Sequence, residues 1–397
     1  MTSRNLRYIT SNRVFDGYHF LPNGTCMAVD STGQIVDILK RESCPQDELE
    51  VFKGVLCPGF INAHCHLELS HMRGILEEKT GLIPFINGIL ANREAPTEVI
   101  QQCMAECDTE MYENGIVAVG DISNTIDSFN VKSNSKIYYH TFVEIFDLDP
   151  KKATTTFDKG MEVYHQLSKL GLSGSLAPHA PYTVSKELFH MINSFNKDHL
   201  NLSTLHNQET LAENDFYLTG KGLLNQFFNE INVDISFFEP TGKKSLPSTL
   251  GFMSDISKVI LAHNTVSEID DIQFAERTIN EVFWCTNPNA NLYIENRLPE
   301  YQYFIDQNVT LTVGTDSIAS NWQLSIYEEM RTIKNQFPHI TTEQLLSWAT
   351  SNGAKALGIE TWAGSFSKGM KPGIVHIESL DVMHTEWDAE SYPKRLI

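Results

Sequence analysis

The fold of this 397-residue chain is decided by a short, largely apolar run that ends in two histidines. Residues 58–74 read Pro58-Gly59-Phe60-Ile61-Asn62-Ala63-His64-Cys65-His66-Leu67-Glu68-Leu69-Ser70-His71-Met72-Arg73-Gly74. Side chains two residues apart on a β-strand point to the same face, so His64 and His66 point together while Cys65 points away. A continuous apolar run before them is typical of a buried parallel strand. The pair therefore predicts two imidazoles at the end of one buried strand.

Apolar runs of the same kind recur downstream and alternate with longer helical periods, which is typical of βα units around a parallel sheet. The predicted strands cover residues 59–66, 116–121, 136–145, 173–178, 201–206, 258–263, 281–286 and 310–315. Predicted helices cover residues 97–112, 154–170, 185–196 and 341–357, and Pro96, Ser185 and Thr341 stand at helix starts. Eight strands are the number that closes a (β/α)₈ TIM barrel, which we expect over residues 58–357.

Both ends of the chain have a different pattern, with short segments broken by turn residues. We expect residues 1–57 and 358–397 to pair into one small composite β-sandwich domain beside the barrel. Residues 239–254 are polar and rich in Gly, Pro and Ser. They fit either a lid over a site or a solvated connection, and the sequence leaves both open.

Charge and composition exclude several classes of partner. The chain has 30 Lys and Arg against 50 Asp and Glu, a formal net charge of −20, and no basic block offsets it. Such a surface repels nucleic acid and anionic membranes. No apolar run is long enough for a signal peptide or a membrane span, and seven scattered cysteines suit reduced thiols. These features predict a cytoplasmic protein.

Three further metal-binding side chains stand where predicted strands end: His206, His263 and Asp316. The active sites of barrel enzymes lie at the carboxyl ends of the strands, so these groups are expected to meet His64 and His66. A single buried histidine is more often part of a core, but packing does not explain the repetition at four strand ends. Nitrogen donors with one carboxylate, and one position left for water, fit a catalytic zinc or a similar metal.

Glu209 follows His206 by three residues, where the chain leaves the strand. A carboxylate there is placed to carry a proton between an activated water and a leaving group. The alternative is a helix N-terminal charge before Leu211. We favour the catalytic role because a predicted metal ligand lies beside it.

At these residues the chain resembles the amidohydrolase superfamily, in its cytosine-deaminase-related and chlorohydrolase-like branch. The segment from Pro58 to Gly74 resembles the first-strand signature of that branch, and the likeness extends over nearly the whole chain. Further matching segments are Ala177-Pro178-His179-Ala180-Pro181-Tyr182-Thr183, His206-Asn207-Gln208-Glu209-Thr210, Ala262-His263-Asn264, Asn287-Pro288-Asn289-Ala290-Asn291-Leu292 and Gly314-Thr315-Asp316-Ser317-Ile318-Ala319-Ser320-Asn321.

The resemblance implies a role for each matching residue. It implies His64, His66, His206 and Asp316 as metal ligands, Glu209 as proton shuttle and His263 as the group that orients the attacking water. Asp316 is a second candidate for removing the proton of that water, and His179 is implied to contact substrate. Residues 173–178 contain no lysine, so the modified lysine of two-metal branches has no candidate. We therefore expect one divalent ion per chain, zinc first, with iron or manganese as alternatives.

The activity that the resemblance implies is hydrolytic deamination of an aminated heterocycle: a nucleobase, a nucleoside or an aminofutalosine-like compound. The segment His66-Leu67-Glu68-Leu69-Ser70 resembles that of aminofutalosine deaminases. Hydrolysis of a cyclic amide such as an imidazolone, dechlorination of a triazine and a non-catalytic metal-binding scaffold stay open, because fold alone does not fix chemistry. A homodimer is also left open. Further candidate substrate contacts are Glu68, Arg73, Asn289 and Arg297, although the two arginines equally suit ordinary ion pairs.

Overall fold

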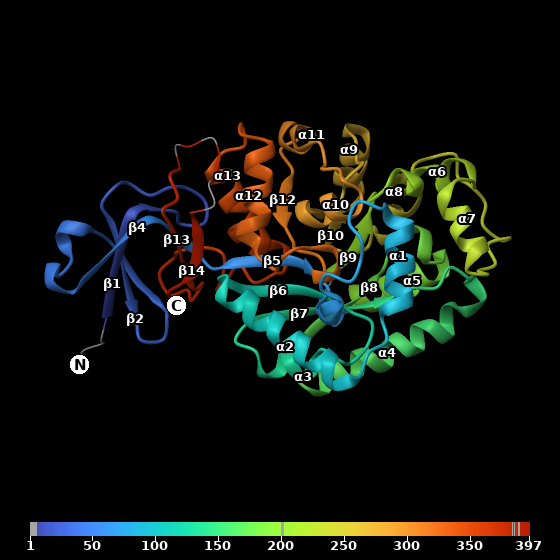
Figure 1. The fold of residues 1–397 in the computed structure, drawn as a ribbon, viewed down its shortest axis with the longest axis horizontal. Coiled ribbons are helices and arrows are strands. Elements are labelled where there is room, and N and C mark those ends of the chain that lie inside the picture. Colours follow the sequence, from blue (N-terminus) through green and yellow to red (C-terminus); the bar gives the residue numbers. More distant parts are fainter. Residues whose placement is uncertain (1–5, 200–201, 383, 385, 388–389) are drawn as a thin grey trace.

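The computed structural model describes residues 6–199, 202–382, 384, 386–387 and 390–397. Its strands form two parallel four-stranded sheets and one mixed six-stranded sheet (Figure 1). Helices alternate with the parallel strands along the chain, so the protein has the mixed α/β fold that the strand and helix pattern predicted. Among the helices in the described residues, we find none with the length and apolar character needed to cross a membrane.

The parallel strands are the ones that the apolar runs predicted, and almost all their residues are buried. The first sheet holds β5 (Phe60–Cys65), β6 (Ile116–Ser123), β7 (Tyr138–Ile145) and β8 (Ser173–Pro178); the second holds β9 (Leu202–Asn207), β10 (Lys258–His263), β11 (Glu281–Thr286) and β12 (Thr310–Val313). Burial on both faces explains their rich content of Val, Ile, Leu and Ala. Asn201, at the start of one predicted strand, lies outside the described residues.

Hydrogen bonds join the two parallel sheets at both edges. At one edge the Asp316 amide donates to the His64 carbonyl at 3.0 Å, and at the other the His206 amide donates to the His179 carbonyl at 2.9 Å. The buried side chain of Asn62 adds a clamp, because it accepts from the Thr315 amide at 3.0 Å and donates to the Thr315 hydroxyl at 2.7 Å. These contacts hold the carboxyl end of β5 to that of β12, and the end of β8 to that of β9.

Helices pack around the sheets, and a smaller group lies at the carboxyl ends of the strands (Figure 1). The packing helices include α2 (Thr97–Glu113), α3 (Phe129–Asn134), α4 (Ala153–Lys169), α5 (Lys186–Lys197), α9 (Ile269–Thr278), α10 (Pro288–Ile294), α11 (Tyr301–Asp306) and α12 (Ile326–Gln336). The second group includes α1 (Leu82–Asn92), α6 (Leu211–Thr219) and α7 (Leu223–Glu230), which the sequence analysis did not predict. Two predicted start signals are confirmed, since the Ser185 hydroxyl accepts from Leu188 and that of Thr341 from Gln344.

The predicted helix over residues 341–357 is interrupted. It consists of α13 (Thr342–Ser347), a π-helical turn at Trp348–Asn352 and α14 (Gly353–Ala356). The Trp348 carbonyl accepts from the Thr312 hydroxyl at 3.2 Å, and a Cβ added to Gly353 would lie 2.7 Å from the Cβ of Ile61. The π-helical turn therefore occurs where this segment packs closely against β5 and β12.

Residues 239–254 are not a lid over the site. They contain α8 (Ser245–Thr249) and a 3-10 turn at Leu250–Met253. Leu246, Leu250 and Met253 are fully buried in the main apolar core. The segment is a packed connection, because apolar residues at helical spacing anchor it despite its polar composition.

Strands from both ends of the chain share one sheet, in the order β14-β13-β4-β1-β2-β3. They are β1 (Leu6–Val14), β2 (Thr25–Asp30), β3 (Ile35–Lys40), β4 (Leu49–Pro58), β13 (Ile374–Glu378) and β14 (Tyr392–Arg395). Antiparallel pairing of β13 with β4 brings strands from both ends of the chain into this sheet. The predicted sandwich is not shown, since within the described residues these strands form a single sheet.

Candidate functional site

His64 and His66 end β5 and point to one face, as strand alternation predicts. The His64 side chain is fully buried, and neither ring nitrogen has a hydrogen-bond partner among the described residues. An imidazole buried without partners is costly, so this ring has the environment of a ligand rather than of a core residue.

His206, His263 and Asp316 come to the same place from the ends of β9 and β10 and from the turn after β12. The Nε2 atoms of His66 and His206 lie 3.1 Å apart, and Asp316 Oδ1 lies 3.4 Å from His66 Nε2. The same oxygen lies 3.7 Å from His64 Nε2. Two triads, His64 with His66 and His206, and His64 with His263 and Asp316, each bring their donor atoms within 4.8 Å of one another.

Hydrogen bonds outside the cluster fix how two of these rings present their nitrogens. His206 Nδ1 donates to the His179 carbonyl at 2.8 Å, and His263 Nδ1 donates to Asn291 Oδ1 at 3.0 Å. In each ring Nε2 is then left with a lone pair. Backbone and amide acceptors of this kind are the usual orienting partners of metal-binding histidines.

Burial favours the uncharged form of three of these imidazoles. Loss of solvent lowers the pKa of His66 to about 3, and it also lowers the pKa values of His206 and His263. Burial acts to raise the pKa of Asp316, but the nearby imidazoles, that of His64 foremost, outweigh it and hold that pKa below its usual value. Neutral imidazoles and one ionised carboxylate are the forms that bind a metal ion.

The residues therefore fit a divalent ion. Three or four imidazole nitrogens and one carboxylate oxygen converge, and His64 has no other partner in the described chain. This donor set suits zinc, iron or manganese rather than calcium or magnesium, which prefer oxygen ligands.

Glu209 lies beside the cluster on the loop between β9 and α6. Its side chain is buried, and Oε1 lies 3.7 Å from His263 Nδ1. Burial raises the pKa of the carboxyl well above its usual value, and the charges of Asp316 and Glu295 add to the effect. The N-cap of α6 is Thr210, whose hydroxyl accepts from Ala212, so Glu209 does not cap the helix. A buried carboxyl with a raised pKa is suited to exchange protons near neutral pH.

A cavity of about 600 Å³ opens above the cluster. The polar side chains that line it at the cluster are His66, His179, His206, Glu209, His263 and Asp316. The apolar part of the lining comes from α1 (Leu82, Phe85, Ile86, Ile89 and Leu90) and from α7 and the turn after it (Phe227, Phe228 and Ile231), and we call it the apolar arm. Outside the cluster the lining also holds charged side chains: Arg93, Glu144, Asp147, Asp149, Lys152 and Asp234.

Of the predicted substrate contacts, the structure brings only His179 to this cavity. Glu68 is buried away from it and accepts from the amides of Asn124 and Thr125. Arg73 forms an ion pair with Glu110 of α2. Each side chain already has a partner elsewhere.

Asn289 and Arg297 also lie outside the cavity lining. Asn289 is buried, with its amide donating to Glu329 and its side chain accepting from Thr332. Arg297 is exposed on the turn after α10. Neither position matches the substrate contact that the sequence analysis expected.

The sequence analysis also missed residues that do line the cavity: Glu144 and Phe146 at the end of β7, Tyr182 after β8, and the apolar residues of α1 and α7. Glu144 stands at a strand end, the signal that identified His206 and His263. The apolar residues carried no such signal, because a helix that lines a cavity has the same pattern as one that packs on a core.

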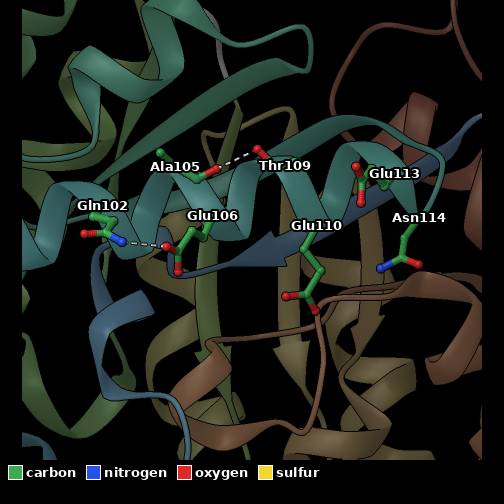
Figure 2. Close-up of a pocket in the computed structure, with 7 residues that line it drawn as sticks. All are labelled: Gln102, Ala105, Glu106, Thr109, Glu110, Glu113 and Asn114. Carbon is green, nitrogen blue, oxygen red and sulfur yellow. Dashed lines mark hydrogen bonds between the residues drawn. The ribbon is translucent and has the colours of Figure 1, made fainter.

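Figure 2 shows a different hollow, along the exposed side of α2. It is lined by Gln102, Ala105, Glu106, Thr109, Glu110, Glu113 and Asn114. None of the predicted site residues lines it, and it has no histidine or cysteine in its lining. It is therefore set apart from the donor cluster.

Comparison with known proteins places this architecture in a family. The model of the amidohydrolase family matches residues 55–391. A 5'-deoxyadenosine deaminase of Methanococcus maripaludis is 28% identical over 337 residues, which are 80% of this chain and 74% of that protein. The solved structure of Helicobacter pylori aminofutalosine deaminase with methylthio-coformycin has a TM-score of 0.81 at 21% identity, covering 96% of this chain and 94% of that one.

A second solved structure, the atrazine chlorohydrolase TrzN of Arthrobacter aurescens complexed with zinc, has a TM-score of 0.72 at 18% identity and covers 93% of this chain and 86% of that one. At these identities the two solved structures support a shared fold and nothing more. The family match, by contrast, spans most of the chain. The chain belongs to the amidohydrolase family and is a hydrolase acting on carbon–nitrogen bonds, as the resemblance carried by the first-strand segment and the strand-end segments implied.

Proposed function

We propose that the protein hydrolytically deaminates the amino-purine ring of an adenosine-like nucleoside, with one divalent metal ion, zinc first, held by His64, His66, His206 and Asp316. The observation that carries the proposal is the convergence of these donors with a buried, protonatable Glu209 at the inner end of the cavity. The deaminase relatives support the same chemistry.

In this proposal the residues of the chain divide the work. When bound, the metal ion supplies a Lewis acid that lowers the pKa of water toward neutrality. Glu209 takes a proton from the attacking water and delivers it to the ring nitrogen next to the carbon under attack. His263, with Nδ1 committed to Asn291, accepts a hydrogen bond from that water through Nε2 and so orients it. A carbon–oxygen bond forms, and the second proton of the water passes through Glu209 to the exocyclic amino group. The carbon–nitrogen bond then breaks, ammonia leaves, and the ring carbon keeps the oxygen as a carbonyl.

The shape of the cavity supports a nucleoside with an uncharged far end. A volume of about 600 Å³ is ample for a nucleoside and generous for a free base. The arm formed by α1 and α7 offers apolar side chains. Moving a deoxy, thioether or aromatic substituent from water onto these side chains costs less free energy than moving a phosphate there. The net charge of −20 also disfavours a polyanionic substrate.

We further propose that the two parallel sheets close into a (β/α)₈ barrel over residues 58–357, with residues 1–57 and 358–397 as the second domain. Closure is supported by the bonds at both sheet edges, from Asp316 to His64 and from His206 to His179. The clamp between Asn62 and Thr315 supports it too.

The test is ammonia release by the purified, metal-loaded protein. We expect ammonia from adenosine, 5'-deoxyadenosine or aminofutalosine, and much less from adenine or cytosine. Opening of a cyclic amide frees no ammonia, so turnover of an imidazolone without ammonia from any amino-heterocycle would replace the proposal. Release of chloride from a triazine under the same conditions would favour dechlorination.

A further inference from the structure

We propose that Glu144 binds a hydroxyl group on the sugar of the substrate and thereby makes the protein select nucleosides over free nucleobases. The proposal rests on the proposed function. Glu144 is the second-last residue of β7 (Tyr138–Ile145), and its side chain lines the cavity. Only 7% of the residue is exposed. A carboxylate this buried requires hydrogen-bond donors.

One carboxylate oxygen of Glu144 is held in place by a short chain of polar side chains. Asn124 Nδ2 donates to Oε2 at 2.8 Å, and Arg93 in turn donates to Asn124 Oδ1 at 2.8 Å. The backbone N–H of Asn124 donates to Glu68 Oε2 at 3.0 Å. These contacts fix the direction of the carboxylate, so its second oxygen keeps one orientation in the cavity wall.

The second oxygen, Oε1, is buried and has no hydrogen-bond partner among the described residues. The nearest imidazole nitrogen is His206 Nδ1 at 3.5 Å, but its single proton goes to the His179 carbonyl at 2.8 Å. An acceptor left unpaired in a preformed cavity matches a donor that arrives with the ligand.

A second acceptor stands beside it. His179 Nδ1 donates to the Thr183 hydroxyl at 2.8 Å, because that hydroxyl gives its own proton to the Ala180 carbonyl at 3.1 Å. His179 Nε2 is therefore an acceptor on a ring that lines the same cavity. One ring nitrogen or carboxylate oxygen from each of Glu144, His179 and His206 lies within 4.8 Å of those of the other two. Two acceptors on side chains this close suit the two neighbouring hydroxyls of a ribose.

A metal ion is the other occupant to consider at this group of three. His206 Nδ1 carries the proton that it donates to His179, so it has no lone pair for a second cation, and Nε2 of the same ring faces His66. Glu144 and His179 are therefore left without the third electron-pair ligand that a cation would need. A neutral hydroxyl donor is the better match.

The position of Glu144 also suits the middle of a nucleoside. Glu144 Oε1 lies 3.5 Å from His206 Nδ1 of the donor cluster. Leu148, four residues farther along the chain, belongs to one buried apolar cluster with Leu82 of α1 and with Phe227 and Phe228 of α7. If the amino-purine lies at the donor cluster and an uncharged substituent lies against α1 and α7, the sugar lies between the cluster and these helices, beside Glu144.

The experiment compares two substrates on three proteins: adenosine and 2',3'-dideoxyadenosine on the wild type, Glu144→Gln and the control Glu276→Gln. Glu276 is an exposed residue of α9 whose carboxyl accepts from Trp284 Nε1 at 2.9 Å, and it does not line the cavity. We expect Glu144→Gln to lower kcat/KM for adenosine by roughly 10- to 100-fold, the effect of one hydrogen bond to a charged group. For the dideoxy substrate, wild type and Glu144→Gln should be equal. Glu276→Gln should behave as wild type.

Binding of inosine and 2',3'-dideoxyinosine, measured by calorimetry on the same proteins, separates this proposal from the proposed function, because neither compound has an amino group to lose. Wild type should bind inosine more tightly than the dideoxy compound, and in Glu144→Gln this difference should shrink by roughly 10-fold or more, whether or not any nucleoside is deaminated. Equal binding of the two compounds by the wild type would overturn the proposal. So would an equal loss for both substrates in Glu144→Gln, metal loss in that variant, or two tightly bound ions per wild-type chain.

Discussion

His263 and Asp316 have left-handed backbone conformations, with φ values of 69° and 57°, as do Gln208 and Asn264 beside them, at 44° and 58°. A residue other than glycine pays roughly 1 to 3 kcal/mol for such a conformation. Strain of this size persists only where the surroundings impose it. Here the imposing contacts are the bond from the Asp316 amide to His64 and the bond from His263 to Asn291.

Glu209→Gln isolates proton transfer from metal binding. The amide keeps the shape of the side chain and leaves the four predicted ligands untouched, so we expect the metal content to stay the same. Turnover should fall by roughly 10² to 10⁴, the usual effect of a positioned acid and base. Metal content, melting temperature and rate are measured on one sample. If the variant has full metal and nearly normal turnover, Glu209 does not transfer the proton, and the role passes to Asp316 or His263.

Replacing His64 or Asp316 with Ala should remove both metal and turnover, because each loses a donor at the centre of the cluster. The matched control is His140→Ala. His140 is equally buried, but it bonds to Ser173 and Ser175 and does not line the cavity. The control should lose stability and keep its metal. Elemental analysis that finds a full metal complement in His64→Ala would contradict the ligand assignment.

Glu213 gives the stability of the fold a pH dependence. Burial raises its pKa from 4.5 to about 7, so between these values the folded chain keeps a proton that the unfolded chain has lost. The free energy of unfolding therefore falls as pH rises through that window, by about 3 kcal/mol in total. Glu213→Gln should lack this loss and gain on the wild type from pH 5 to pH 8 in urea titrations. Parallel stability curves for the two proteins would disprove the shift.

The site residues that the sequence predicted are those whose role follows from a strand end. His64, His66, His206, His263 and Asp316 converge because carboxyl ends of parallel strands meet. Arg73 and Glu68 could not be placed in this way, because their partners, Glu110 and Asn124, are 37 and 56 residues away in the chain. The free oxygen of Glu144 depends on contacts of the same long-range kind.

At the scale of elements, a buried ion pair holds the turn that follows β5. Lys132 of α3 lies 2.6 Å from Asp121 of β6, and both side chains are fully buried. The other oxygen of Asp121 accepts from the Leu67 amide at 2.8 Å, directly after His66. Lys132 also donates to the hydroxyls of Ser123 and Thr141. The pair thus connects three elements to the end of the histidine strand.

Lys132→Met should destabilise the protein by about 3 to 5 kcal/mol, because it leaves a buried carboxylate unpaired. The double variant Asp121→Asn/Lys132→Met should recover part of that loss, since no charge then stays buried. Urea unfolding of the single and double variants measures both effects. A single variant within about 0.5 kcal/mol of the wild type would show that the ion pair adds nothing to the fold.

The sequence predicted elements that have a continuous apolar run, and it did not predict elements whose form depends on contacts with distant segments. β8, β10 and β11 have the bounds that their apolar runs predicted, because burial on both faces leaves a continuous signal. The π turn at Trp348–Asn352 depends on a close contact of Gly353 with β5, which no local pattern reveals. The buried helix α8 was hidden by the polar composition of the segment around it.

At the scale of the whole molecule, strands from both ends of the chain, β1 to β4 and β13 to β14, form the six-stranded sheet. The part of the chain between them contains the residues of the site. β4 passes directly into β5 through Gly59, where a Cβ would lie 2.2 Å from Val117 and 2.7 Å from the Pro372 carbonyl. The terminal sheet is therefore packed tightly against the start of the histidine strand. The cytoplasmic location and the homodimer stay predictions.

The most direct test of the account is the rate of ammonia release from 5'-deoxyadenosine, measured while metal-free protein is titrated with zinc. The account predicts no turnover without metal and a rate that rises in proportion to bound zinc and levels off at about one ion per chain. Turnover by the chelated protein, or a rate that rises only with a second ion, would contradict it. So would a fully loaded protein that releases no ammonia from any adenosine-like nucleoside.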